Sequence, residues 1–212
     1  MSTSRNIACQ HGSSMIEVLI TLIILLVGLL GLAGLMVQGQ RSEMESYQRV
    51  QALILLQDMV GRINANRAVA SCYAYTAASG TPYLGTGSAL VPACAAGTAA
   101  QNAQAVADMN AWDTALNGAA ETASGVNVGV MVGARGCVSY DAASACTSAG
   151  AAVVGSGKYT VEVAWQGLGN TFAPVSLACG KNLYGNEAQR RVVSLPFRVG
   201  SISNNTGSLT CP

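Results

Sequence analysis

The sequence has little charge, few aromatic side chains and almost no histidine. Only 10% of the 212 residues are charged, 5% are aromatic, and His11 is the one histidine. An ordinary soluble domain carries about 25% charged residues. With 11 basic and 10 acidic residues, the chain has no strong field to attract nucleic acid or an anionic lipid surface. Half of the residues are hydrophobic, which excludes a disordered chain.

The motifs of enzymes and metal sites are also missing. His11 lies within the first twelve residues, so no histidine is available further along the chain for a Ser-His-Asp or Cys-His site, and the sequence has no CxxC pair for zinc. Residues 155–158 (GSGK) lack the first glycine and the final Ser or Thr of a phosphate-binding loop, so we interpret them as a turn. We interpret Asp108, Asp113 and Glu162 as solvated surface carboxylates. We therefore expect no enzyme, no catalytic or metal-binding residue and no cofactor.

What the sequence does have is one long hydrophobic run near its start. It extends from Met15 to Val37 and is interrupted only by Glu17 and Thr21. A helix needs about 20 apolar residues to span a hydrocarbon core of about 30 Å. A cleaved secretory signal usually has a shorter apolar region, of about 7–15 residues, followed by a cleavage site of small residues. The run is longer than that and lacks such a site, which favours a single-pass membrane anchor.

The carboxylate of Glu17 lies near the polar end of this run. A charge at the centre of a bilayer costs about 2.5–3.5 kcal/mol on insertion scales, and such residues usually have a partner. If the chain is cut after Gly12, the new amine of Ser13 lies four residues before Glu17. The amine and the carboxylate of neighbouring subunits could then neutralise each other in the apolar core of a fibre. An unpaired carboxylate at the membrane surface is the alternative.

The leader of residues 1–12, the sequence GSSMIE at 12–17 and the apolar run together resemble the class III signal of type IV prepilins. The resemblance implies that a prepilin peptidase cuts between Gly12 and Ser13 and then methylates the amine of Ser13. It also implies that Glu17 registers an incoming subunit during assembly. The chain departs from the family at Ser13, where Phe or Met is common. By this resemblance it is an inner-membrane protein of a Gram-negative bacterium, with a periplasmic head, that later joins a pilus on the cell surface.

Helical spacing continues beyond the apolar run. Leu53, Leu56, Val60 and Ile63 recur at three- and four-residue steps, which predicts an amphipathic helix. No proline occurs between residues 13 and 67, so one helix of about 50 residues is permitted. We therefore expect a cleaved leader at 1–12, the transmembrane half of a long helix at 13–38, its amphipathic half at 39–67, and a periplasmic globular head at 68–212.

The head is expected to contain a short helix and a small antiparallel sheet. Residues 71–100 are rich in small residues and are typical of a loop. The spacing of apolar residues over 106–116 predicts a helix, which Asn117 and Gly118 would end. Strands are predicted over 126–132, 159–165 and 191–195. The fold class is therefore α+β, with a long amino-terminal helix packed on a small antiparallel sheet in a pilin-like, disulfide-stabilised arrangement.

Six of the seven cysteines lie in the predicted head, and Cys9 lies in the leader. The six are Cys72, Cys94, Cys137, Cys146, Cys179 and Cys211. An even number outside the cytoplasm indicates structural disulfides, although six cysteines allow 15 pairings. Our hypothesis is that neighbours pair, because each bond then closes a local loop: Cys72–Cys94, Cys137–Cys146 and Cys179–Cys211.

Several segments beyond the apolar run are similar to those of minor pilins in the same family. They are residues 61–67 (GRINANR) of the predicted helix and, in the head, 134–137 (ARGC), 163–167 (VAWQG), Cys179 with Tyr184 and Gly185, and 190–193 (RRVV). The resemblance implies a low-abundance subunit that takes part in priming pilus assembly. Its expected partners are other minor pilins, the major pilin, the prepilin peptidase, the inner-membrane assembly machinery and the membrane itself, with no nucleic acid. Two other functions stay open, a type II secretion pseudopilin and a pilus-tip adhesin or binding subunit.

Overall fold

The computed structural model describes residues 14–88, 91–119, 122–124, 126–127, 129, 131–148, 151–153, 155–200 and 209–212. The leader expected at 1–12, with Cys9 and Gly12, and also Ser13 lie outside these residues. The chain divides into two compact units, Met1–Met44 and Glu45–Pro212. One helix, α1 (Met15–Ala65), supplies the described part of the first unit apart from Ser14 and continues into the second.

In the first unit, α1 is apolar and exposed. An 18-residue window of the helix has a mean hydropathy of 2.9, and none of that window is buried. By length and composition the helix can cross a membrane. This part of α1 therefore indicates a membrane anchor or a signal sequence.

The second unit, which we call the head, begins with the remaining turns of α1. The buried residues along this segment recur at three- and four-residue steps: Gln48, Ala52, Leu56, Met59 and Ile63. The predicted apolar stripe is confirmed at Leu56 and Ile63 but is wrong at Leu53, whose side chain is 41% exposed. Leu53 lies about 100° around the helix from the buried Ala52, which turns it away from the core.

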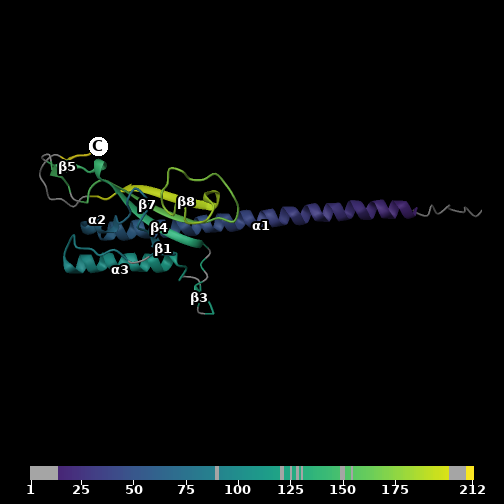
Figure 1. Ribbon diagram of the computed structural model, residues 1–212, viewed down its shortest axis with the longest axis horizontal. Coiled ribbons are helices and arrows are strands. Elements are labelled where there is room, and N and C mark those ends of the chain that lie inside the picture. Colours follow the sequence, from purple (N-terminus) through teal and green to yellow (C-terminus); the bar gives the residue numbers. More distant parts are fainter. Residues whose placement is uncertain are drawn as a thin grey trace, which may run out of the picture. The chain divides into compact units, whose positions relative to one another are not determined.

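A four-stranded antiparallel sheet packs against this part of α1 (Figure 1). The strands lie in the order β1 (Leu84–Gly85), β4 (Val132–Asp141), β7 (Lys158–Gln166) and β8 (Arg190–Arg198). Along β7, Tyr159, Val161, Val163 and Trp165 are buried on the face that joins the main core. The expected α+β class and antiparallel sheet are confirmed.

Two of the three predicted strands are found at their expected places, within β7 and β8. The third, expected over 126–132, is wrong. Residues Val126–Asn127 form β3, which pairs only with β2 (Thr122–Ala123), whereas Val132 begins the long strand β4. Val128 and Val130 of the predicted strand lie outside the described residues. Gly133 and Gly136 interrupt the apolar alternation of β4, which hid this strand from sequence patterning.

The second helix, α3 (Ala99–Leu116), begins at Ala99 rather than at Val106. Its first turn is held by a capping box, in which the Thr98 side chain accepts the backbone N–H of Gln101 and the Gln101 side chain accepts that of Thr98. The helix stops at Asn117 and Gly118, as the sequence predicted: Asn117 is the C-cap, and Gly118 has a φ of 79°.

The expected loop at 71–100 contains most of one short helix and all of β1. The other short elements are η1 (Arg67–Val69), α2 (Ala70–Tyr73), η2 (Ala142–Ser144), β5 (Thr147–Ser148), β6 (Ala151–Ala152), η3 (Glu187–Gln189) and β9 (Leu209–Thr210).

The main core lies where α1, α3 and the sheet meet. Trp112 of α3 is fully buried and donates its indole N–H to the Leu55 carbonyl of α1 at 2.8 Å. Trp165 of β7 donates to the Gln48 side chain of α1 at 3.2 Å. These two hydrogen bonds hold α3 and β7 at different positions along α1: α3 at Leu55 and β7 at Gln48. A second, small apolar cluster, formed by Cys137, Ala164, Cys179 and Tyr184, lies apart from the main core.

Candidate functional site

The first candidate site is Glu17, which lies in the first turn of α1. Its backbone N–H donates to the Ser14 carbonyl at 2.9 Å, which starts the helix immediately before the apolar run. Every residue from Met15 to Met44 is exposed within the chain. Among the described residues, the Glu17 carboxylate has no ion-pair partner. Gly12 and Ser13, the other two residues of the predicted processing site, lie outside the described residues.

A second site lies where the head segment of α1 begins. Arg191 of β8 donates to the Glu45 carboxylate at 3.0 Å and to the Gly169 carbonyl at 2.8 Å. This ion pair borders a cavity of about 340 Å³ that is also lined by Arg49 and Trp165. Arg49 is exposed and has no hydrogen-bond or ion-pair partner among the described residues. Through Arg191, β8 and the loop that precedes it are tied to the first turn of α1 in the head.

A third polar cluster joins α1 to α3 and centres on Asp108. This carboxylate is only 6% exposed and accepts hydrogen bonds from the hydroxyl of Tyr73 at 2.6 Å, Gln104 at 2.9 Å and Arg62 at 3.3 Å. The interpretation of Asp108 as a solvated surface carboxylate is therefore wrong, and it is also wrong for Glu162, which is half-buried and accepts the backbone N–H of Cys179. Burial, together with its bond to Asp108, raises the pKa of the Tyr73 hydroxyl, so the tyrosine is a neutral donor.

The Asp108 cluster also lines a groove of about 450 Å³, into which Asp58, Asn66 and Gln104 face. Arg62 bridges the two carboxylates of this groove, donating to Asp58 at 2.8 Å as well as to Asp108. Each carboxylate and the guanidinium between them are thus paired. We interpret the cluster as a tie between two helices rather than as an acid–base pair for catalysis.

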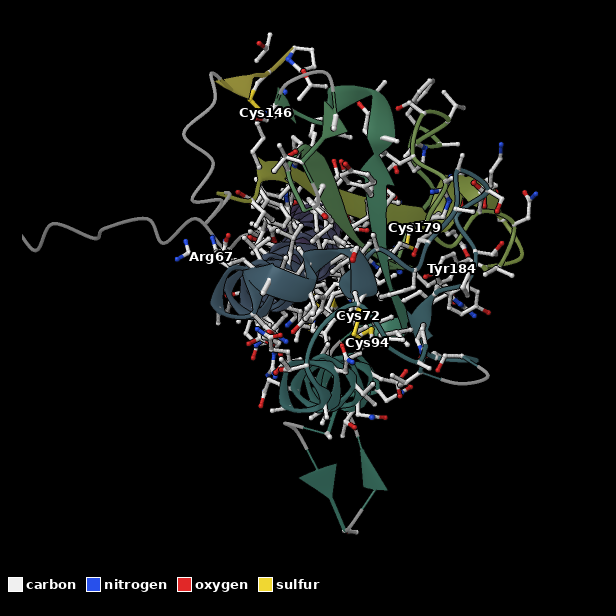
Figure 2. The ribbon with its side chains drawn as sticks, turned by 90° about the vertical axis from the view of Figure 1, so that its left-hand side faces the viewer. Arg67, Cys72, Cys94, Cys146, Cys179 and Tyr184 are labelled. Carbon is white, nitrogen blue, oxygen red and sulfur yellow. A yellow bond between two sulfur atoms is a disulfide. The ribbon has the colours of Figure 1, made fainter. Side chains whose placement is uncertain are left out.

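The six head cysteines form three disulfides, as the sequence predicted, but only one pairing of the hypothesis is confirmed. Cys72 bonds Cys94. Cys137 bonds Cys179, and Cys146 bonds Cys211. The proposed pairs Cys137–Cys146 and Cys179–Cys211 are wrong. In Figure 2 the Cys72–Cys94 bond is drawn beside the α3 ribbon, and Cys179 lies near Tyr184.

Sheet register explains the two unexpected pairings. Cys137 of β4 lies opposite Glu162 of β7, and the Glu162 side chain accepts the backbone N–H of Cys179 at 3.3 Å. Near the carboxyl terminus, Thr147 of β5 pairs with Thr210 of β9, which brings the adjacent Cys146 and Cys211 together. Both bonds join segments far apart in sequence. Local loop closure, on which the hypothesis rested, could not reveal them.

The segment between β7 and β8, residues 167–189, forms an ordered loop around Arg190. The Arg190 side chain is fully buried and donates to the carbonyls of Pro174 at 3.1 Å, Leu177 at 2.9 Å and Cys179 at 3.1 Å. It also forms an ion pair with Glu187 at 2.7 Å. Burial alone would raise the pKa of Glu187, but the bonds to Arg190 and to the N–H of Asn182 lower it. Arg190 thus fixes the path of the whole loop.

Sequence reasoning missed Arg190, Asp108 and this loop as organised features. Arg190 belongs to the RRVV segment, and nothing local in that segment distinguishes the buried Arg190 from the half-buried Arg191. The strongest available signal was the two adjacent arginines in a chain with few charges. Comparison of the chain with known protein families, with curated proteins and with solved structures found no match. The architecture itself, a long apolar amino-terminal helix followed by a disulfide-bonded antiparallel sheet, is pilin-like.

Proposed function

We propose that the chain is a minor type IV pilin, a structural subunit that takes part in priming and assembly of the pilus. The observation that carries the proposal is α1 itself: its first turns are apolar and exposed, yet they hold one carboxylate, Glu17, without an ion-pair partner among the described residues. An apolar helix of this kind suits a bilayer before assembly and a bundle of like helices afterwards. Glu17 then needs a positive partner.

The processing step supplies that partner. A prepilin peptidase would cut after Gly12 and leave an amine on Ser13, which is then methylated. The amine of one subunit and the Glu17 carboxylate of its neighbour would pair in the fibre. Other minor pilins, the major pilin and the inner-membrane assembly machinery are the corresponding partners. Three disulfides support a periplasmic location for the head, since such bonds persist in oxidising compartments.

Among minor pilins, the head segments are most similar to those of PilV, the type IV pilus modification protein. The resemblance rests on residues 61–67, 134–137, 163–167 and 190–193, and on Cys179 with Tyr184 and Gly185. In the head, Arg190 and Cys137 of these segments hold the β7–β8 loop. A type II secretion pseudopilin would share the leader and Glu17. Deletion separates the two functions, because loss of surface pili supports the minor pilin and loss of secretion supports the pseudopilin.

Substitution of Glu17 tests the proposal directly. Glu17→Gln keeps the shape of the side chain and removes its charge, so we expect normal membrane insertion and cleavage after Gly12 but at least a several-fold loss of co-purification with other minor pilins. Glu17→Ala should act in the same direction. The N-terminus is read by mass spectrometry, and surface pili are counted. If both variants assemble as the wild type does, charge pairing by Glu17 is refuted.

A further inference from the structure

The loop of residues 167–189 presents apolar side chains to solvent. Phe172 is 86% exposed, Val175 72% and Leu168 48%. The chain has only two phenylalanines, and one of them, Phe172, lies in this loop. Residues 168–175, with the sequence LGNTFAPV, contain no charge. An ordered, uncharged and apolar protrusion of this kind marks a contact surface.

The position of the loop in the head follows from strand register. Gln166, the last residue of β7, pairs with Arg190, the first of β8, so the loop leaves and rejoins the sheet at one end. At the same end, Arg191 contacts both Gly169 of the loop and Glu45, the first residue of the head. The apolar loop therefore lies at the end of the head where α1 enters it. Figure 1 shows this loop beside the start of β8.

The loop is held in place before any partner binds. The N–H of Gly167 donates to the Gln189 carbonyl at 2.8 Å, and that of Thr171 donates to the Ala188 carbonyl at 2.7 Å. The buried Arg190 fixes the Pro174 carbonyl, and the Cys137–Cys179 disulfide ties the loop to β4. Little conformational entropy is left to lose when Phe172 and Val175 become covered, which favours binding.

We propose that the β7–β8 loop docks on the membrane surface while the chain is anchored in the bilayer, with Phe172 and Val175 in the lipid interface. The proposal rests on the membrane anchoring that the proposed function requires. Only seven residues, 38–44, lie between Val37, at the end of the apolar run, and Glu45. The eight residue-to-residue steps from Val37 to Glu45 span at most about 28 Å, so the chain keeps this end of the head close to the lipid. The uncharged segment 168–175, with the exposed ring of Phe172, suits the interface, where apolar side chains reach about 5–10 Å into the boundary layer.

The test places a fluorescent reporter in the loop of the full chain. Phe172→Trp is reconstituted in phosphatidylcholine vesicles whose acyl chains carry bromine, a contact quencher of indole emission. The wild type gives the background, because Trp112 and Trp165 are buried. Ala143→Trp is the matched control, since Ala143 is exposed just beyond the opposite end of β4. We expect about a two-fold loss of the added emission at position 172 and little loss at position 143.

A second pair of variants tests the apolar contact itself. Val175→Asp added to Phe172→Trp should weaken the selective quenching strongly, because moving a carboxylate into the apolar part of the interface costs free energy, whereas Val175→Thr should keep it. Equal quenching at positions 172 and 143 would overturn the docking, as would quenching that Val175→Asp leaves unchanged.

Flotation of the vesicles separates this proposal from the proposed function. Protein that does not float with the vesicles contradicts the anchor and the docking together, whereas protein that floats without selective quenching contradicts the docking alone. If quenching is absent and Phe172→Asp instead blocks co-purification with other minor pilins, the loop contacts protein and the membrane proposal is wrong.

Discussion

At the scale of single residues, burial decides which carboxylates matter to the fold. Asp108 is buried but accepts three hydrogen bonds, which offset much of its desolvation. Glu162 is half-buried on β7 and accepts one bond, from the N–H of Cys179. Burial raises the pKa of Glu162, partly countered by that bond and by Arg190. Folding therefore favours the protonated form of Glu162, and its charge opposes folding at neutral pH.

We predict that Glu162→Gln stabilises the head at pH 7. Glutamine keeps the carbonyl oxygen that accepts the Cys179 N–H but carries no charge. The pKa of Glu162 is raised in the folded state, so the cost of its charge is fully present above that pKa. The cost disappears as the pH falls below the ordinary glutamate value of about 4.3. Thermal unfolding should thus give a higher midpoint for Glu162→Gln at pH 7 and equal midpoints near pH 3. A constant difference at both pH values would contradict this account.

At the scale of elements, one buried side chain organises the loop between β7 and β8. We predict that Arg190→Met lowers the free energy of unfolding by about 3 kcal/mol, since three carbonyls and Glu187 lose their donor in a buried site. The variant should also become sensitive to protease within 167–189. Arg49→Met is the control, because Arg49 is exposed and should change stability by less than about 0.5 kcal/mol. Equal stability of the two variants would refute the role of Arg190.

The contact between β4 and α3 requires a glycine. A Cβ atom at Gly136 would clash with the Trp112 ring and lie 2.7 Å from a methyl carbon of Leu116. Gly136→Ala should therefore destabilise the head by about 1–3 kcal/mol in denaturant unfolding. Gly61→Ala in α1 is the matched control, because nothing lies within 4 Å of a Cβ there, and alanine favours a helix by about 1 kcal/mol. We expect the two variants to move stability in opposite directions, and a shift in the same direction would contradict the packing argument.

The elements that the sequence could predict are those whose pattern is local. Apolar alternation over 159–165 predicted β7, and the length of the apolar run predicted α1. The strand β4 was not predicted because Gly133 and Gly136 break its apolar alternation, and Gly136 is needed for the close approach of Trp112 and Leu116 of α3, which the sequence does not reveal. The disulfide partners of Cys137 and Cys146 could not be predicted, because they depend on strand register between segments that are distant in sequence. The burial of Asp108 could not be predicted, because its donors Tyr73 and Arg62 are distant in sequence and no local pattern indicates them.

At the scale of the whole molecule, the long helix has two different roles. Up to Met44 its side chains are exposed, whereas from Gln48 onward it supplies one wall of the main core. Leu56, Met59 and Ile63 are almost fully buried in the head. The head thus depends on a segment of α1 that the sequence assigned to the amphipathic half of the helix, 39–67, rather than to the globular part at 68–212.

This division predicts where the chain can be cut. A fragment of residues 45–212, produced in an oxidising compartment, should be soluble and unfold cooperatively, because it keeps every buried residue of α1 and omits the exposed apolar turns. A fragment of residues 66–212 should fail to do so. It loses the Leu55 carbonyl that accepts the Trp112 indole, the Gln48 side chain that accepts the Trp165 indole, and Arg62, which donates to Asp108.

Near-ultraviolet circular dichroism during thermal unfolding measures the difference between the fragments. In the shorter fragment two indoles have lost their acceptors and the apolar face of the sheet is uncovered. We therefore expect it to lack fixed aromatic packing and to give a weak near-ultraviolet signal. Free thiols are titrated in both fragments as a control, so that a failure to form the disulfides is not mistaken for an effect of removing the helix. If residues 66–212 alone give a cooperative transition at the temperature of the longer fragment, α1 is only an attachment to the head and not part of its core.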